Sequence, residues 1–125
     1  MEKELKLKKT QYIKESNGWL RALNELRIEN TRLKDRLSEA ISGNVSLDFV
    51  EQAEHFQQRF IENDQVVDLL RHDVNAFLYK LTEQKMKGVA EHQCVTLAKD
   101  IEQLIFEFNK MKISFLNFLI SNEPG

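Results

Sequence analysis

The sequence contains very little glycine, proline or cysteine. Among its 125 residues are four Gly, one Pro and one Cys, and the proline, Pro124, is next to the last residue. Because Gly and Pro are the residues that most often interrupt helices, their scarcity leaves long stretches without a break. The lone Cys94 has no partner for an internal disulfide, which is typical of a reducing compartment. We therefore expect a cytoplasmic protein.

Long apolar runs and an excess of one charge are also missing. No stretch is long and apolar enough to cross a bilayer, and the N-terminus lacks the apolar run of a signal peptide. The formal net charge is -2, so the chain as a whole has no charge that would attract nucleic acid or an anionic membrane. We expect neither as a partner.

What remains is a pattern of apolar residues spaced three and four apart, which predicts amphipathic helices. We expect an all-α fold in one domain spanning residues 1–125, with helices at about residues 5–42, 47–87 and 89–121. Ser46 has the side chain of a good helix N-cap, and Gly88 is the expected turn before the third helix. A break within the second helix at Asn63 and Asp64 is the alternative left open there.

Each segment carries a heptad seam, the row of a and d positions with which helices pack. In the first segment the seam includes Tyr12, Ser16, Trp19, Leu23, Leu26, Asn30, Leu33, Leu37 and Ala40. In the second it is Phe49, Ala53, Phe56, Phe60, Asn63, Val67, Leu70, Val74, Phe77 and Leu81. In the third it is Ala90, Cys94, Leu97, Ile101, Leu104, Phe108, Met111, Phe115 and Phe118.

The first seam is narrow and has a polar residue, Asn30, at an a position. A buried Asn there can fix register in a two-stranded coiled coil, and Glu29 and Lys34 stand at the g and e positions that pair across such a dimer. Residues 23–37 resemble a leucine zipper, which implies a parallel coiled coil. Unlike the DNA-binding zipper proteins, this chain has no basic region before the zipper.

The third segment is apolar on nearly every side at residues 113–120, which is typical of association with another chain. Two architectures follow: an up-down-up antiparallel three-helix bundle, or a dimeric helical hairpin with an N-terminal coiled-coil arm. We favour the dimer. The residues expected at the oligomer or partner interface are Trp19, Leu23, Leu26, Asn30, Leu33, Leu37, Phe115, Leu116, Phe118 and Leu119.

Residues that could perform chemistry are few. None of the three histidines has the Glu three residues before it that helical di-iron sites use, and no two histidines are spaced to bind one metal ion. Cys94 lies on the third seam, where a thiol packs as a small apolar group. We expect no metal, no cofactor and no catalytic residue.

One short segment resembles the histidine-containing box of histidine-kinase dimerisation domains. His72, Asp73, Val74, Asn75 and Leu78 match its pattern, whereas Phe77 replaces the family's Pro. The resemblance covers nine residues and implies that His72 would accept phosphate, with Asp73 activating it. Our leading hypothesis is a non-enzymatic scaffold or regulatory protein that acts through self-association and an unidentified protein partner. The alternative is a phosphorelay module that uses His72.

Overall fold

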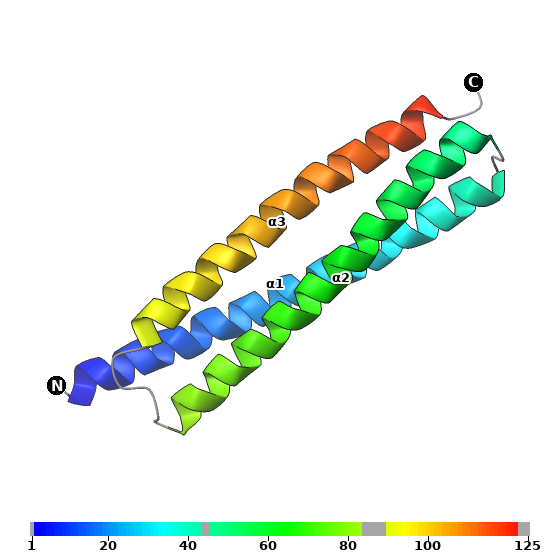
Figure 1. Ribbon diagram of the computed structural model, residues 1–125. Helices are drawn as coiled ribbons and strands as arrows, with labels where there is room; N and C mark the ends of the chain where they lie inside the picture. Colours follow the sequence, from blue (N-terminus) through cyan, green and yellow to red (C-terminus); the bar gives the residue numbers. More distant parts are fainter. Residues whose placement is uncertain (1, 44–45, 84–89, 123–125) are drawn as a thin grey trace.

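The protein is a bundle of three long helices. The structure, a computed structural model, describes residues 2–43, 46–83 and 90–122. Helix α1 spans Glu2–Gly43, α2 spans Leu47–Thr82 and α3 spans Ala90–Ser121, and the described residues include no strand. The helices run up, down and up, so α2 is antiparallel to the other two (Figure 1). The all-α fold predicted from the heptad pattern is confirmed.

The helix boundaries follow from local chemistry. Ser46 is the N-cap of α2, where its side chain accepts a hydrogen bond of 3.3 Å from the backbone N–H of Phe49. Helix α2 is continuous through Asn63 and Asp64, so it has no break there, and it ends at Thr82, five residues before the predicted end. The turn expected at Gly88 and the start expected at Val89 lie outside the described residues.

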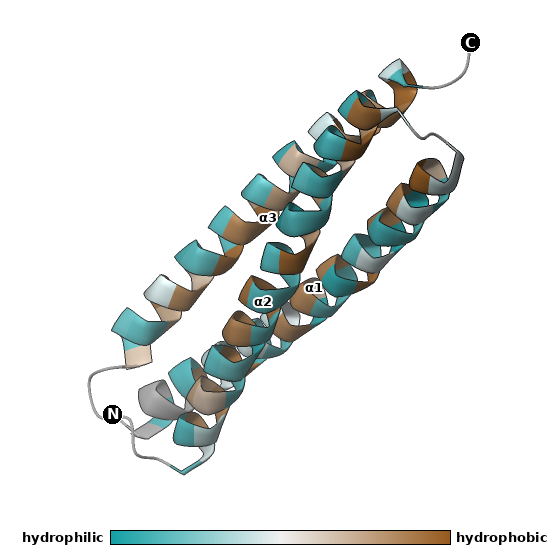
Figure 2. Ribbon diagram, turned by 45° about the vertical axis from the view of Figure 1, so that its right-hand side comes forward, coloured by the Kyte–Doolittle hydropathy of each residue, from teal (hydrophilic) through white to brown (hydrophobic). Residues whose placement is uncertain are grey.

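The core is built from the predicted seams. Every seam position of α2 except Asn63 is buried, and every seam position of α3 except the half-buried Ala90 is buried. In Figure 2 the hydrophobic residues lie along the sides of the helices that face one another. At the end of the bundle that holds the start of α2, the core is aromatic. The ring centroids of Phe60 and Phe115 are 5.1 Å apart, and those of Phe49 and Phe118 are 5.0 Å apart.

Helix α1 packs along α2 and α3 of its own chain, so the structure shows the three-helix bundle and not a hairpin with an extended arm. Its narrow stripe, which is typical of a coiled-coil seam, is here enclosed by two helices of the same chain. Leu23, Leu33 and Leu37 of this seam are buried in the shared core.

A polar contact in the middle of the bundle joins α1 to α2. The Nδ2 of Asn30, which is fully buried, donates hydrogen bonds to the backbone carbonyl of Phe60 at 2.9 Å and to Oδ1 of Asp64 at 2.8 Å. The other carboxylate oxygen of Asp64 pairs with Lys34. Glu29, on the other side of α1, pairs with Lys112 of α3. The charges expected to pair across a dimer thus find partners within one chain.

These hydrogen bonds give the first prediction. Asn30→Ala leaves the carboxylate of Asp64 without its amide donor, so we expect it to lower the free energy of unfolding by about 1–3 kcal/mol. Asn24→Ala is the matched control, because Asn24 is an exposed residue of the same helix and the change in helix propensity is the same. Urea unfolding measures both variants. If the two substitutions shift the midpoint equally, the buried amide contributes nothing specific.

Candidate interaction surface

The predicted interface residues of α1 lie inside the bundle. Trp19 is half-buried, and Leu23, Leu26, Asn30, Leu33 and Leu37 are at most 5% exposed. These side chains come together with α2 and α3 of the same chain. They therefore present almost no surface to a second protein while the bundle is folded.

The predicted interface residues of α3 divide into two groups. Phe115 and Phe118 are buried in the aromatic part of the core, whereas Leu116 and Leu119 are half-buried. The interface prediction left out the large apolar residues that face solvent on this helix, although the sequence had placed Ile113 and Ile120 in the apolar stretch at residues 113–120. Val95 is 62% exposed. Phe106 is 58% exposed, Ile113 is 61% exposed and Ile120 is 66% exposed.

These three residues recur every seven positions, and Asn109 and Leu116 fall between them at spacings of three and four. We call these five residues the α3 stripe. Because its spacing is that of a heptad seam, the stripe follows one side of α3, on the face away from the seam that packs in the core. The regular recurrence of 106, 113 and 120 was the sequence signal that could have located it.

His72 and Asp73 are both exposed on α2. Exposure on a helix is the ordinary environment of a surface histidine, and it is also what a phosphate acceptor would need. The geometry around His72 therefore does not favour phosphotransfer over a solvated side chain, and we propose no function for this residue.

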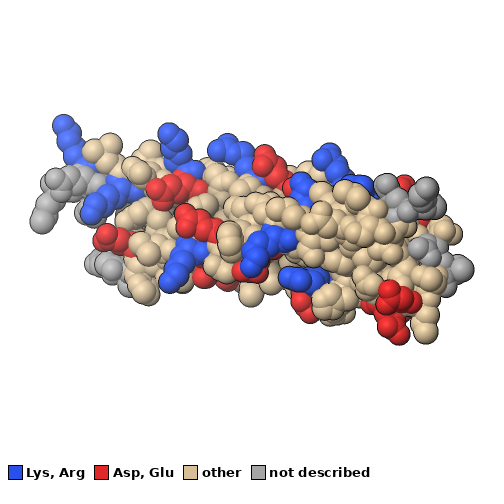
Figure 3. Space-filling view, turned by 90° about the horizontal axis from the view of Figure 1, so that it is seen from above, with Lys and Arg blue, Asp and Glu red and all other residues tan. Residues whose placement is uncertain are grey.

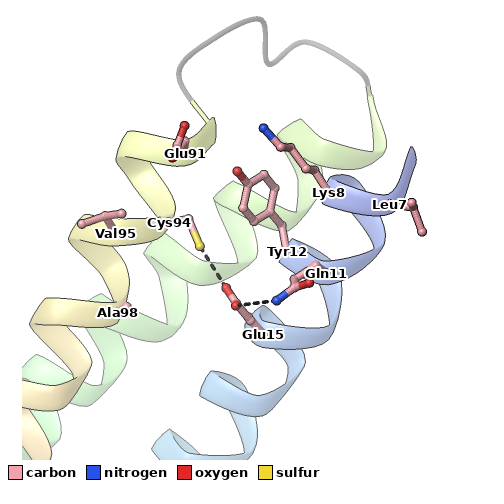
Figure 4. A pocket seen from close by; sticks show the side chains of 9 residues that line it. All are labelled: Leu7, Lys8, Gln11, Tyr12, Glu15, Glu91, Cys94, Val95 and Ala98. Atoms are coloured by element: carbon pink, nitrogen blue, oxygen red, sulfur yellow. Dashed lines mark hydrogen bonds between the residues drawn. The ribbon is translucent and has the colours of Figure 1, made fainter. Parts of the chain in front are cut away.

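A second feature is a cavity of about 470 Å³ between the N-terminal parts of α1 and α3. Figure 4 shows the side chains that line it, among them Tyr12 and Glu15 from α1 and Glu91 and Cys94 from α3. The thiol of Cys94 donates a hydrogen bond of 3.1 Å to Oε2 of Glu15.

The surroundings of this cavity keep its thiol and its phenol in their protonated forms. Burial raises the pKa of Cys94 to about 12, and the hydrogen bond to Glu15 and the charge of that carboxylate act in the same direction. Burial and the nearby acidic groups, Glu91 first among them, also raise the pKa of Tyr12. A protonated thiol is a poor nucleophile, so the cavity is not arranged for catalysis by Cys94.

Within residues 2–43, 46–83 and 90–122, no group of three or more His, Cys, Asp or Glu side chains is positioned to hold a metal ion. None of the described helices is long and apolar enough to cross a membrane. Comparison of the chain with protein-family models, with curated proteins and with solved structures gives no significant match. We therefore interpret the α3 stripe, the best-defined surface feature, from its spacing and exposure alone.

The environment of Cys94 gives the second prediction. A pKa near 12 in place of 9.0 leaves roughly a thousandfold less thiolate at pH 8, so iodoacetamide should alkylate the native protein far more slowly than the unfolded chain. Glu15→Gln removes a negative charge beside the thiol and should accelerate alkylation of the folded protein. Mass spectrometry follows the reaction. Equal rates for the wild type and Glu15→Gln would show that the carboxylate does not influence the thiol.

Proposed function

We propose that the protein is a non-enzymatic interaction module, a scaffold or regulatory protein that binds a helix of a protein partner along the α3 stripe. The observation that carries this proposal is the exposure of Phe106, Ile113 and Ile120 in one heptad row on a helix whose core seam is already filled. Three large apolar side chains are exposed in one row on this helix, and exposed apolar surface is a common feature of interaction sites.

The spacing of the stripe supports a helix as the occupant. An amphipathic helix that lies along a second helix contacts it at every third and fourth residue, which is the spacing of the stripe. Complete burial of one such side chain contributes about 1.5–3 kcal/mol, so three of them can supply a substantial part of a specific affinity. The stripe lies on a helix that is already formed and packed, so binding need not order this surface first.

Self-association, predicted from the first seam, remains an alternative use of the same stripe. The seam of α1 does not support it, because those side chains fill the core of a single chain. A cytoplasmic location is part of the proposal and is supported by the free thiol of Cys94.

Ile113→Asp tests this function. It places a charge in the middle of the stripe without entering the core, so we expect the fold to persist and partner binding to be lost. Leu69→Asp is the matched control, because Leu69 is 60% exposed on α2, outside the stripe. Tagged wild type and both variants are purified from the cells that express the protein, and the proteins retained by each are compared.

The expected result is a protein that the wild type and Leu69→Asp retain and that Ile113→Asp loses. If Ile113→Asp retains the same proteins as the wild type, the stripe is not the binding surface. Circular dichroism of each variant verifies that the helices are intact.

A further inference from the structure

We infer that the first turns of α3, residues 90–100, open by local unfolding while the rest of the bundle stays folded. The opening is a conformational device of the fold, and it controls access to the buried thiol of Cys94. It also uncovers the rings of Tyr12 and Phe77, which line the cavities beside this segment. Residues 90–100 lie outside the α3 stripe, so this inference is independent of the proposed function.

The segment buries few of its own side chains. Cys94 and Leu97 are the buried residues among residues 90–100, and each is 7% exposed. The rest of α3 buries larger side chains at its seam positions, which are Ile101, Leu104, Phe108, Met111, Phe115 and Phe118. Because the stability of a segment depends on the apolar surface that it buries, we expect the start of α3 to be the least stable part of the helix.

A cavity lies on each side of the segment. The cavity of about 470 Å³ lies between it and α1, and a second cavity of about 360 Å³ lies between it and α2. The residues of α3 that line the two cavities all lie between positions 91 and 100, with Cys94 at the first and Leu97 at the second. A side chain that borders a cavity has fewer atoms in van der Waals contact, so packing holds this segment less firmly.

One polar contact joins the segment to another helix. The thiol of Cys94 donates a hydrogen bond to Glu15 of α1 (Figure 4). Residues 90–100 form no salt bridge with the described residues of α1 and α2. A thiol is a weak hydrogen-bond donor, so this contact adds little to the stability of the segment. Farther along α3, the ion pair between Lys112 and Glu29 joins that helix to α1.

Helices α1 and α2 hold each other at this end of the bundle without α3. The ring of Phe77 on α2 contacts two rings of α1, with centroid distances of 6.1 Å to Tyr12 and 6.5 Å to Trp19. These contacts do not include residues 90–100. The pairing of α1 and α2 can therefore persist while the start of α3 is open.

Charge has little influence on the opening. The Asp, Glu and Lys residues of the segment are Glu91, Lys99 and Asp100, and all three are exposed. On the face drawn in Figure 3, acidic and basic side chains are interspersed. Exposed charges of mixed sign contribute little to stability, so we expect added salt to change the opening only slightly.

Alkylation of Cys94 by iodoacetamide in the full-length protein measures the opening, because Cys94 is the only cysteine. The rate is followed by mass spectrometry at one fixed pH and at urea concentrations below the unfolding midpoint. A local opening exposes less surface than complete unfolding. We therefore expect the rate to rise less steeply with urea than the equilibrium constant of global unfolding does.

Two core substitutions distinguish local from global opening. Leu97→Ala weakens the packing of the segment itself, so we expect it to accelerate alkylation without urea by at least about tenfold. Met111→Ala is the matched control, because Met111 is 2% exposed on the same seam but lies in the part that stays folded. It should lower the unfolding midpoint without accelerating alkylation in the absence of urea. Circular dichroism verifies the helices, and Leu97→Val and Met111→Val are the milder pair.

Alkylation that follows the global unfolding constant at every urea concentration, and that both variants accelerate in proportion to their loss of stability, would overturn the inference. The thiol would then be reached only when the whole chain unfolds. A rate that depends neither on urea nor on Leu97→Ala would also overturn it, because iodoacetamide would then reach Cys94 in the closed bundle.

Hydrogen exchange followed by mass spectrometry gives an independent measurement on the wild type. The backbone amides of residues 94–100 lie beyond the first turn of α3, so they form hydrogen bonds within the helix. We expect them to exchange faster than the amides of residues 105–118. Equal protection of the two ranges would contradict the local opening.

Discussion

Asn30 places a buried amide in the middle of an apolar seam, and its hydrogen bonds to the Phe60 carbonyl and to Asp64 set how α1 lies against α2. A sliding motion of either helix would separate these atoms, and the buried amide of Asn30 would lose both of its acceptors. Loss of such a partner costs about 1–3 kcal/mol, which exceeds what most single surface contacts contribute. The contact therefore selects one alignment of α1 and α2 among the several that a leucine-rich seam would tolerate.

This selectivity has a cost in stability. Oδ1 of Asn30 and Nδ2 of Asn63 are buried without a hydrogen-bond partner among the described residues. An apolar residue at position 30 would avoid this loss but would leave the register of α1 and α2 less specified, a compromise that helical assemblies commonly make.

With α1 held in this way, its seam is enclosed by its own chain. The apolar surface left open in a regular row is then the stripe on α3, which is why we propose a binding function for that helix.

The heptad pattern predicted much of this fold because helix packing is set by local spacing. The seams of α2 and α3 and the Ser46 cap all appear in the structure where their spacing and chemistry placed them. The helix against which a seam packs is harder to predict from the sequence. An Asn at an a position can be satisfied by a second chain or by a carbonyl of the next helix, and nothing in residues 23–37 distinguishes the two. For the same reason, the charges of Glu29 and Lys34 indicated pairing but not with which helix.

At the end of α3, the heptad pattern also did not predict which apolar side chains are exposed. Where apolar residues occupy nearly every side of a helix, composition does not show which side its neighbours cover. Phe115 and Phe118 are buried because α2 presents Phe56 and Phe60 to them, while Ile113 faces away from the core and is exposed. The candidate site therefore follows from the placement of α1 and α2.

The seam of α1 is buried by α2 and α3 of the same chain, without a second copy. The dependence of the unfolding midpoint on protein concentration tests this most directly. A chain that folds alone has a urea midpoint that does not change with concentration, whereas a coiled-coil dimer becomes more stable by mass action. We expect the midpoint to remain constant when the concentration rises about a hundredfold. A midpoint that rises steadily with the logarithm of concentration would contradict the account.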